Sequence, residues 1–138
     1  MRHIERIIIH CSATPEGRNH TVEDIRKWHL QAGYNDIGYH FVIYLDGTVK
    51  EGRNINLVGA HTSGKNTGSI GICYIGGCDK NMKPKDTRTD AQKKALYELC
   101  KTLIEKYNIK YVNGHNEFAS KACPSFDVKN WIKETRLK

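Results

Sequence analysis

The apolar residues of this chain fall into short continuous runs and into helical repeats, and the two patterns predict different elements. Residues 4–11 hold four isoleucines within six positions, which is typical of a buried strand. Asp46-Gly47 is a hairpin signal that joins two more strands. The further predicted strands cover residues 39–45, 48–51, 69–75 and a short segment that begins at Tyr111-Val112.

Helices are predicted where a capping residue precedes a repeat of about 3.6 residues. Thr21-Val22-Glu23-Asp24 and Thr89-Asp90-Ala91-Gln92 both have the capping-box pattern. The first helix is expected to end at Gly33, the second runs to Tyr107, and Asp127 caps a third. This order of elements predicts an α/β fold, in which a central mixed β-sheet is flanked by helices in a single domain over residues 1–138.

The charge balance narrows the choice of partners. The chain has 22 Lys and Arg against 15 Asp and Glu, a formal net charge of +7. A basic surface favours anionic partners, but these cations are scattered and no signature of a nucleic-acid-binding module is present. We therefore expect no nucleic acid partner, and the charge indicates either an ordinary solvated surface or weak attraction to an anionic polymer.

Nothing in the sequence predicts membrane insertion or export. No apolar run approaches the ~20 residues of a bilayer-spanning helix, and the first residues have no apolar signal-peptide core. We therefore expect synthesis in the cytoplasm and no transmembrane segment. The five cysteines are an odd number without an export signal, so reduced thiols are expected, including the neighbouring Cys73 and Cys78.

Three residues that suit a metal stand at the ends of predicted strands or in the loop that follows. His10 ends the first strand, His115 follows the last, and Cys123 comes eight residues later. Two imidazoles and a thiolate suit Zn²⁺ and leave a fourth position for water, an arrangement that hydrolyses bonds at neutral pH. Taken singly, each residue is more often structural. Strand alternation places His10 and Cys11 on opposite faces, so a site at His10 implies that Cys11 faces a core.

A set of short motifs runs from about residue 4 to residue 132. It includes Ile8-Ile9-His10-Cys11-Ser12-Ala13-Thr14, Gly38-Tyr39-His40-Phe41-Val42-Ile43, Val58-Gly59-Ala60-His61, Asn66-Thr67-Gly68-Ser69-Ile70-Gly71 and the stretch from His115 to Asp127. In combination these motifs resemble the zinc-dependent type 2 family of N-acetylmuramoyl-L-alanine amidases. That family includes small bacteriophage lysozymes, the branch this chain is most similar to, and the peptidoglycan recognition proteins.

The resemblance implies roles for particular residues. One Zn²⁺ per chain is expected on His10, His115 and Cys123, and relatives that have lost activity typically lack the cysteine, which is present here. Tyr39 is expected to orient the attacking water, and Lys121 to stabilise the oxyanion of the tetrahedral intermediate.

Other residues carry weaker expectations. Contacts with the substrate are expected from His61, Asn66 and Ser69. Glu117 is expected either to orient a ligand histidine, to act as a base, or to make a structural hydrogen bond, and His40 is expected to be structural. Trp28 and His29 are expected to be packing residues.

The activity implied by the resemblance is hydrolysis of the amide bond between N-acetylmuramic acid and L-alanine in peptidoglycan. The protein would be a monomeric phage or prophage endolysin that reaches the wall through a membrane lesion. Three alternatives stay open: a non-catalytic peptidoglycan-binding module, an intracellular amidase that recycles soluble muropeptides, and a cysteine hydrolase with Cys11 or Cys123 as its nucleophile.

Overall fold

A five-stranded mixed sheet forms the centre of the computed structural model, which describes residues 2–138. Its strand order is β4-β3-β5-β1-β7. All neighbouring pairs are parallel except β3 and β4, which form the expected antiparallel hairpin. The strands are β1 (Arg6–Cys11), β3 (Phe41–Ile43), β4 (Val49–Glu51), β5 (Ser69–Tyr74) and β7 (Tyr111–Gly114).

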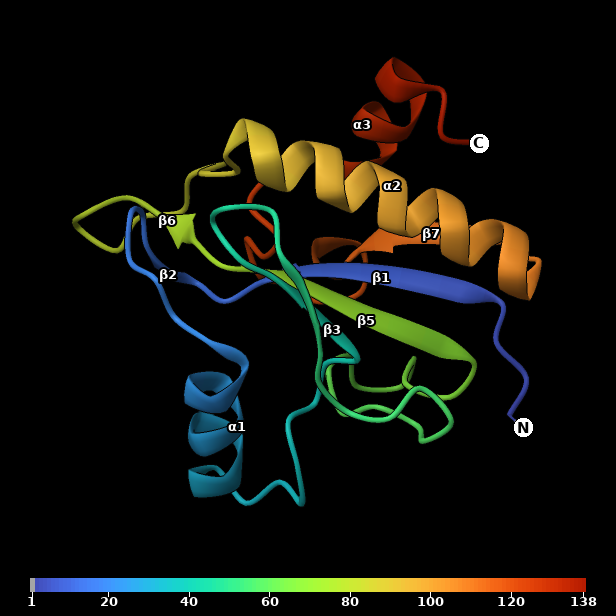
Figure 1. Ribbon diagram of the computed structural model, residues 1–138, viewed down its shortest axis with the longest axis horizontal. Coiled ribbons are helices and arrows are strands. Elements are labelled where there is room, and N and C mark those ends of the chain that lie inside the picture. Colours follow the sequence, from blue (N-terminus) through green and yellow to red (C-terminus); the bar gives the residue numbers. More distant parts are fainter. Residues whose placement is uncertain (1) are drawn as a thin grey trace.

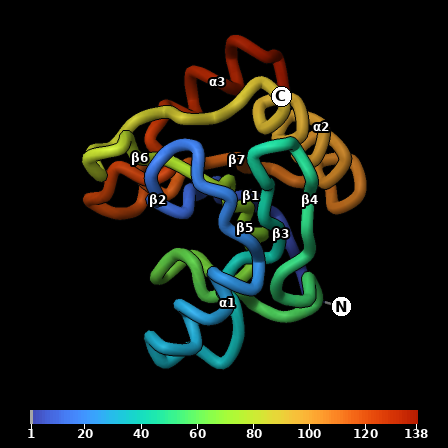
Figure 2. The backbone as a smooth tube through the Cα atoms, turned by 60° about the vertical axis from the view of Figure 1, so that its left-hand side comes forward, coloured from blue at the N-terminus to red at the C-terminus, as the bar shows by residue number. Residues whose placement is uncertain are grey.

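Three helices cover the two faces of this sheet. They are α1 (Val22–Gln31), α2 (Asp90–Tyr107) and α3 (Val128–Thr135). Figure 1 shows α2 and α3 on one side of the sheet and α1 on the other, and Figure 2 shows the same separation from a second direction. The predicted fold, a mixed sheet flanked by helices, is confirmed.

The two capping boxes predicted from the sequence close as expected. Thr21 accepts from the backbone N–H of Asp24, whose carboxylate accepts from the Thr21 N–H. Thr89 and Gln92 make the same reciprocal pair at the start of α2. These contacts satisfy N–H groups that an α-helix leaves without intrahelical partners.

Side-chain alternation along β1 divides the core into two. Ile7, Ile9 and Cys11 face α2 and α3 and belong to the larger core, and Cys11 is only 3% exposed. The smaller core, on the α1 side, includes Ile25 and Cys73. The prediction that Cys11 faces a core is confirmed, and this burial leaves it poorly placed to be a nucleophile.

Two details differ from the sequence-based expectations. The loop after β1 and the end of the β5 segment pair with each other as a second, two-stranded sheet, β2 (Thr14–Pro15) with β6 (Gly77–Cys78). Trp28 was expected to pack, but it is 38% exposed, and its ring lies edge to face with the half-buried His20 at a centroid distance of 5.0 Å. No helix among residues 2–138 combines the length and the apolar character needed to span a membrane.

Candidate active site

The two histidines and the cysteine predicted to bind a metal lie together at the carboxyl edge of the parallel strands. One potential ligand atom from each of His10, His115 and Cys123 lies within 4.8 Å of the others. His10 is the fifth residue of β1 and is fully buried, and His115 follows directly on β7. Because β1 and β7 are parallel neighbours, their carboxyl ends bring the two rings to a centroid distance of 4.6 Å.

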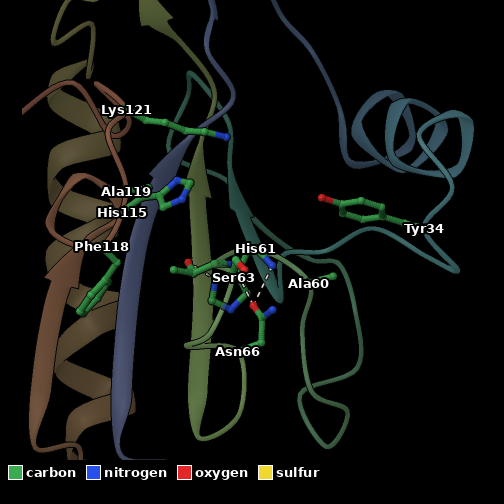
Figure 3. A pocket seen from close by; sticks show the side chains of 10 residues that line it. Tyr34, Ala60, His61, Ser63, Asn66, His115, Phe118, Ala119 and Lys121 are labelled. Carbon is green, nitrogen blue, oxygen red and sulfur yellow. Dashed lines mark hydrogen bonds between the residues drawn. The ribbon is translucent and has the colours of Figure 1, made fainter.

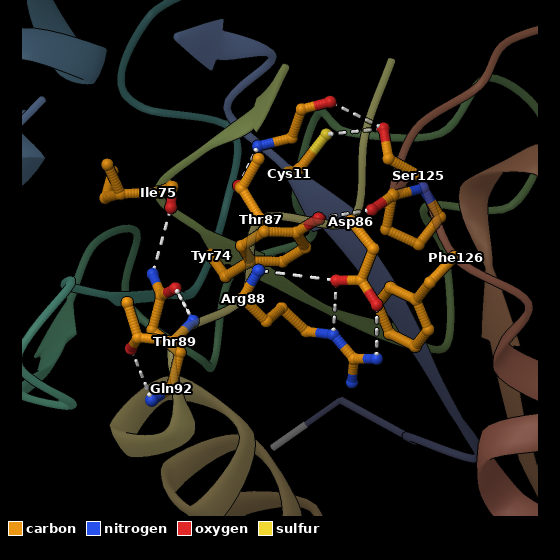
Figure 4. A network of polar contacts seen from close by, with 12 residues as sticks. Cys11, Tyr74, Ile75, Asp86, Thr87, Arg88, Thr89, Gln92, Ser125 and Phe126 are labelled. Atoms are coloured by element: carbon orange, nitrogen blue, oxygen red, sulfur yellow. Dashed lines mark hydrogen bonds and ion pairs between the residues drawn. The ribbon is translucent and has the colours of Figure 1, made fainter. Parts of the chain in front are cut away.

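Cys123 lies in a loop, and each of the three residues that follow it contacts another part of the fold. The Tyr74 hydroxyl donates to the Pro124 carbonyl at 2.6 Å, and the Ser125 hydroxyl donates to the Gly77 carbonyl at 2.8 Å. The Arg88 guanidinium, paired with Asp86, lies 3.5 Å from the centre of the Phe126 ring (Figure 4). The Cys123 sulfur accepts the backbone N–H of Cys11 at 3.2 Å.

The electrostatics of the cluster suit a cation. Burial, and then the nearby His61 and His115, lower the pKa of His10 well below its usual value, and burial followed by the charge of Lys121 lowers that of His115. Both imidazoles are therefore neutral near pH 7, the form that has a free lone pair. The hydrogen bond between the Cys123 and Cys11 side chains, together with burial, raises the pKa of the Cys123 thiol, and the Cys11 backbone N–H acts in the opposite direction. Ionisation of this thiol therefore requires a nearby positive charge. Two neutral imidazoles and one thiol that ionises on metal binding fit Zn²⁺.

Tyr39 lies next to His10 of the cluster, and Lys121 lies next to His115. The half-buried Tyr39 ring lies 5.0 Å from the His10 ring, and burial raises the pKa of its phenol well above the usual value, so its O–H remains a donor. Lys121 is exposed and extends past the His115 ring (Figure 3).

A pocket of about 450 Å³ opens beside the cluster. Its lining includes His115 and Lys121 on one side and Tyr34 on the opposite side (Figure 3). Ala60, His61, Thr62, Ser63, Asn66, Phe118 and Ala119 complete the lining. The cluster formed by His10, His115 and Cys123, called the metal cluster below for its predicted role, therefore shares His115 with this pocket.

The three residues expected to contact substrate occupy different depths. His61 and Asn66 line the pocket. Ser69 does not, because it is fully buried behind His61, with its hydroxyl 3.3 Å from His61 Nε2 and donating to the Asn66 carbonyl. The contacts of Ser69 in this structure are with the protein, and its expected contact with substrate stays a prediction.

Glu117 and His40 both have structural partners. The Glu117 carboxylate accepts from the Gly114 backbone N–H at 2.6 Å and from the Asn113 amide at 3.0 Å, which fixes the turn that carries His115. His40 Nδ1 accepts the Gly71 N–H at 3.0 Å, and its Nε2 lies 2.8 Å from the Leu57 carbonyl.

Sequence reasoning missed three residues of this region. Tyr34 and Phe118 line the pocket, and the Thr62 hydroxyl lies 3.2 Å from His10 Nε2. Tyr34 follows the Gly33 stop signal, which indicated only a loop, and Thr62 had no signal beyond its place next to His61.

His29 packs as predicted. Its Nδ1 accepts the Gly38 N–H at 2.8 Å, and its ring lies between those of Tyr34 and Tyr39 at 4.8 and 5.3 Å. It therefore links the end of α1 to the segment that carries Tyr39.

Comparison with known proteins agrees with this geometry. Residues 1–126 match the family described as N-acetylmuramoyl-L-alanine amidase. The endolysin of Escherichia phage T7 is 45% identical over 133 residues, covering 96% of this chain and 88% of the phage protein. Peptidoglycan-recognition protein SC2 of Drosophila melanogaster is 34% identical over 116 residues, covering 81% of this chain and 60% of that protein.

Solved structures show the same relationship at the level of the fold. The N-acetylmuramoyl-L-alanine amidase LysC from Clostridium intestinale superposes with a TM-score of 0.83 at 30% identity, covering 99% of this chain and 88% of that chain. The chain therefore belongs to the N-acetylmuramoyl-L-alanine amidase family.

Proposed function

We propose that this protein is a zinc-dependent endolysin that hydrolyses the amide bond between N-acetylmuramic acid and L-alanine in peptidoglycan. The observation that carries the proposal is the cluster of His10, His115 and Cys123, whose ligand atoms lie within 4.8 Å of one another beside the pocket. Membership of the amidase family and the 45% identity with a phage endolysin support the same activity.

In this proposal the three residues hold one Zn²⁺. A bound ion supplies Lewis acidity, because it lowers the pKa of a coordinated water toward ~7 and polarises the scissile carbonyl. The Tyr39 hydroxyl donates a hydrogen bond to the attacking water and so orients that water. The Lys121 ammonium, beside His115 at the pocket edge, stabilises the oxyanion of the tetrahedral intermediate, where one well-placed donor contributes about 3 kcal/mol.

The proposal also places the substrate in the pocket and the protein at the cell wall. The pocket between Tyr34 and Phe118 receives the muropeptide, with His61 and Asn66 in its lining. In this proposal the protein is made in the cytoplasm, passes through a membrane lesion and acts on the wall as a monomer, and its similarity to phage endolysins supports action on the wall.

Product analysis by mass spectrometry tests the activity. Purified peptidoglycan is incubated with the protein, with the protein after chelation, and with the chelated protein after zinc is restored. We expect free stem peptides that begin with L-alanine, lost on chelation and regained with zinc. Intact peptidoglycan in the presence of zinc-loaded protein would contradict the endolysin activity and favour a binding module or an enzyme for soluble muropeptides. Cleavage that survives chelation would point instead to cysteine chemistry.

A further inference from the structure

The His61 side chain sits in a slot formed by two glycines. An added Cβ on Gly71 would lie 2.6 Å from the His61 ring, and one on Gly59 would lie 2.7 Å from it. Neither glycine has a positive φ, so close packing requires glycine at both positions: the His61 ring fills the space at Gly71, and at Gly59 it does so together with the His40 ring and the Gly38 carbonyl. His61 is 9% exposed, and its ring packs closely against the backbone of both glycines. Such immobilisation is more than lining a pocket requires.

The loop that carries His61 is fixed as well. The Asn66 side-chain oxygen accepts the backbone N–H groups of both His61 and Thr62, at 2.9 and 2.8 Å (Figure 3). These bonds leave the amide nitrogen of Asn66 as its group for the pocket.

The fixed ring meets the ligand His10 through a hydrogen bond between side chains. His10 Nδ1 faces the Cys123 sulfur at 3.8 Å, whereas His10 Nε2 lies 2.9 Å from His61 Nδ1. A histidine that coordinates through Nδ1 carries its proton on Nε2 and donates it. His61 Nδ1 is then the acceptor, with the Thr62 hydroxyl at 3.2 Å as a second one.

Because His61 Nδ1 is an acceptor, the directions of the hydrogen bonds beyond it follow. With Nδ1 accepting, His61 carries its proton on Nε2, which lies 3.3 Å from the Ser69 hydroxyl oxygen. Ser69 in turn donates to the Asn66 carbonyl at 3.1 Å. Every proton along His10, His61 and Ser69 therefore points away from the metal cluster. The reverse order would place a proton on His10 Nδ1, where the ligand lone pair is needed.

We propose that His61 is a positioning residue for His10, which it holds in the tautomer and ring orientation that binds the metal. This inference rests on the proposed zinc site and assigns His61 a task besides lining the pocket. Partners that orient a ligand histidine typically change metal affinity by about 10- to 100-fold.

A pair of variants of nearly equal size tests this role. Asn keeps an acceptor close to the position of His61 Nδ1, and Leu has the same branching without one. Zinc affinity is measured by competition with a chromogenic chelator. We expect His61→Leu to weaken zinc binding by about 10- to 100-fold. His61→Asn should bind zinc with an affinity much closer to that of the wild type. His20→Leu and His20→Asn, at a histidine that contacts Asp24 and Trp28 instead, should leave zinc affinity unchanged.

Two further measurements separate positioning from packing and from substrate contact. Thermal unfolding of the chelated variants reports packing, and a purely structural role would lower their Tm without separating Leu from Asn in zinc affinity. Nitrogen-15 NMR of the zinc-loaded wild-type protein reports the tautomer directly and needs no variant. We expect protons on Nε2 of both His10 and His61.

The outcomes are distinct. A proton on His10 Nδ1, or equal zinc affinities of the wild-type, Leu and Asn proteins, would overturn the positioning role while leaving the zinc site intact. Equal losses in the Leu and Asn variants would also overturn it, because the hydrogen bond would then not be the cause. A wild-type protein that binds no zinc would overturn the proposed function itself.

Discussion

At the scale of single residues, the buried histidines show how the same side chain serves different purposes. His10 turns its Nδ1 toward the Cys123 sulfur and its Nε2 toward His61. His40 uses both nitrogens on backbone groups, those of Gly71 and Leu57, and so ties β3 and β5 to the long loop. The arrangement at His40 fits only a neutral ring, because Nδ1 must accept.

This neutral ring predicts an acid sensitivity of folding. Burial lowers the pKa of His40 to about 4 from its usual value of 6.5, so between these values the unfolded chain binds the extra proton and the folded one does not. Stability is therefore lost as pH falls from 6.5 toward 4, by about 3 kcal/mol from this residue. In urea unfolding with a chelator present, His40→Gln should be less stable at pH 7 but lose about 2–3 kcal/mol less than the wild type between pH 7 and 4.5.

Parallel losses in the two proteins would contradict this account of His40. His61, whose pKa is lowered first by burial and then by His40, contributes in the same direction in both proteins, and its burial is common to the two. The chelator removes any contribution from metal binding, which has its own pH dependence.

At the scale of elements, local sequence signals were sufficient to predict a helix or strand wherever its structure depends mainly on its own residues. The capping boxes at Thr21 and Thr89, the hairpin at Asp46-Gly47 and the isoleucine run before His10 all predicted elements that the structure confirms. The pairing of β2 with β6 escaped prediction, because two-residue strands have no periodicity and depend on partners more than sixty residues away.

The candidate site divides in the same way. Its residue types and the alternation of His10 with Cys11 could be read from the sequence, and the family motifs supplied His115 and Cys123. The contact between His10 and His61 spans 51 positions and depends on a loop held by Asn66 and on two glycines, so no local pattern predicts it. The burial of Ser69 follows from the same loop.

Gln92 makes two sets of contacts, of which the sequence predicted only the capping box. Its side-chain oxygen closes the capping box on Thr89, and its amide nitrogen donates to the carbonyls of Ile75 and Ile43 at 2.9 and 3.3 Å (Figure 4). It therefore joins the start of α2 to the ends of β3 and β5, at a position with no exposed surface.

We expect Gln92→Leu to destabilise the fold by about 2–3 kcal/mol, because it removes the side-chain half of the capping box and leaves the carbonyls of Ile75 and Ile43 and the Thr89 N–H with fewer partners. Urea unfolding measures this change. Lys94→Leu, an exposed substitution two residues later on the same helix, should change stability by less than about 0.5 kcal/mol. A Gln92→Leu protein as stable as the Lys94 control would show that these bonds add nothing to the attachment of α2.

At the scale of the whole molecule, the sheet separates the site from much of the charge. The metal cluster and pocket lie at the carboxyl edge of the strands, while α2 and α3 cover the opposite face from α1 (Figure 1). The exposed lysines of α2 include Lys93, Lys94 and Lys101, none of which lines the pocket beside the metal cluster. These three lysines therefore act on the approach to a large anionic surface more than on the chemistry in the pocket.

This separation predicts that salt affects intact walls and soluble muropeptides differently. Long-range attraction between exposed charges is largely screened above about 0.15 M salt, so the rate on intact walls should fall as NaCl rises from 50 to 500 mM. The rate on a soluble muropeptide should change much less. Replacing Lys93, Lys94 and Lys101 by Gln lowers the net charge from +7 to +4, and should reduce the low-salt rate on walls and flatten its salt dependence. Equal salt dependence on the two substrates would instead place the decisive charges inside the pocket, with Lys121 the first to examine.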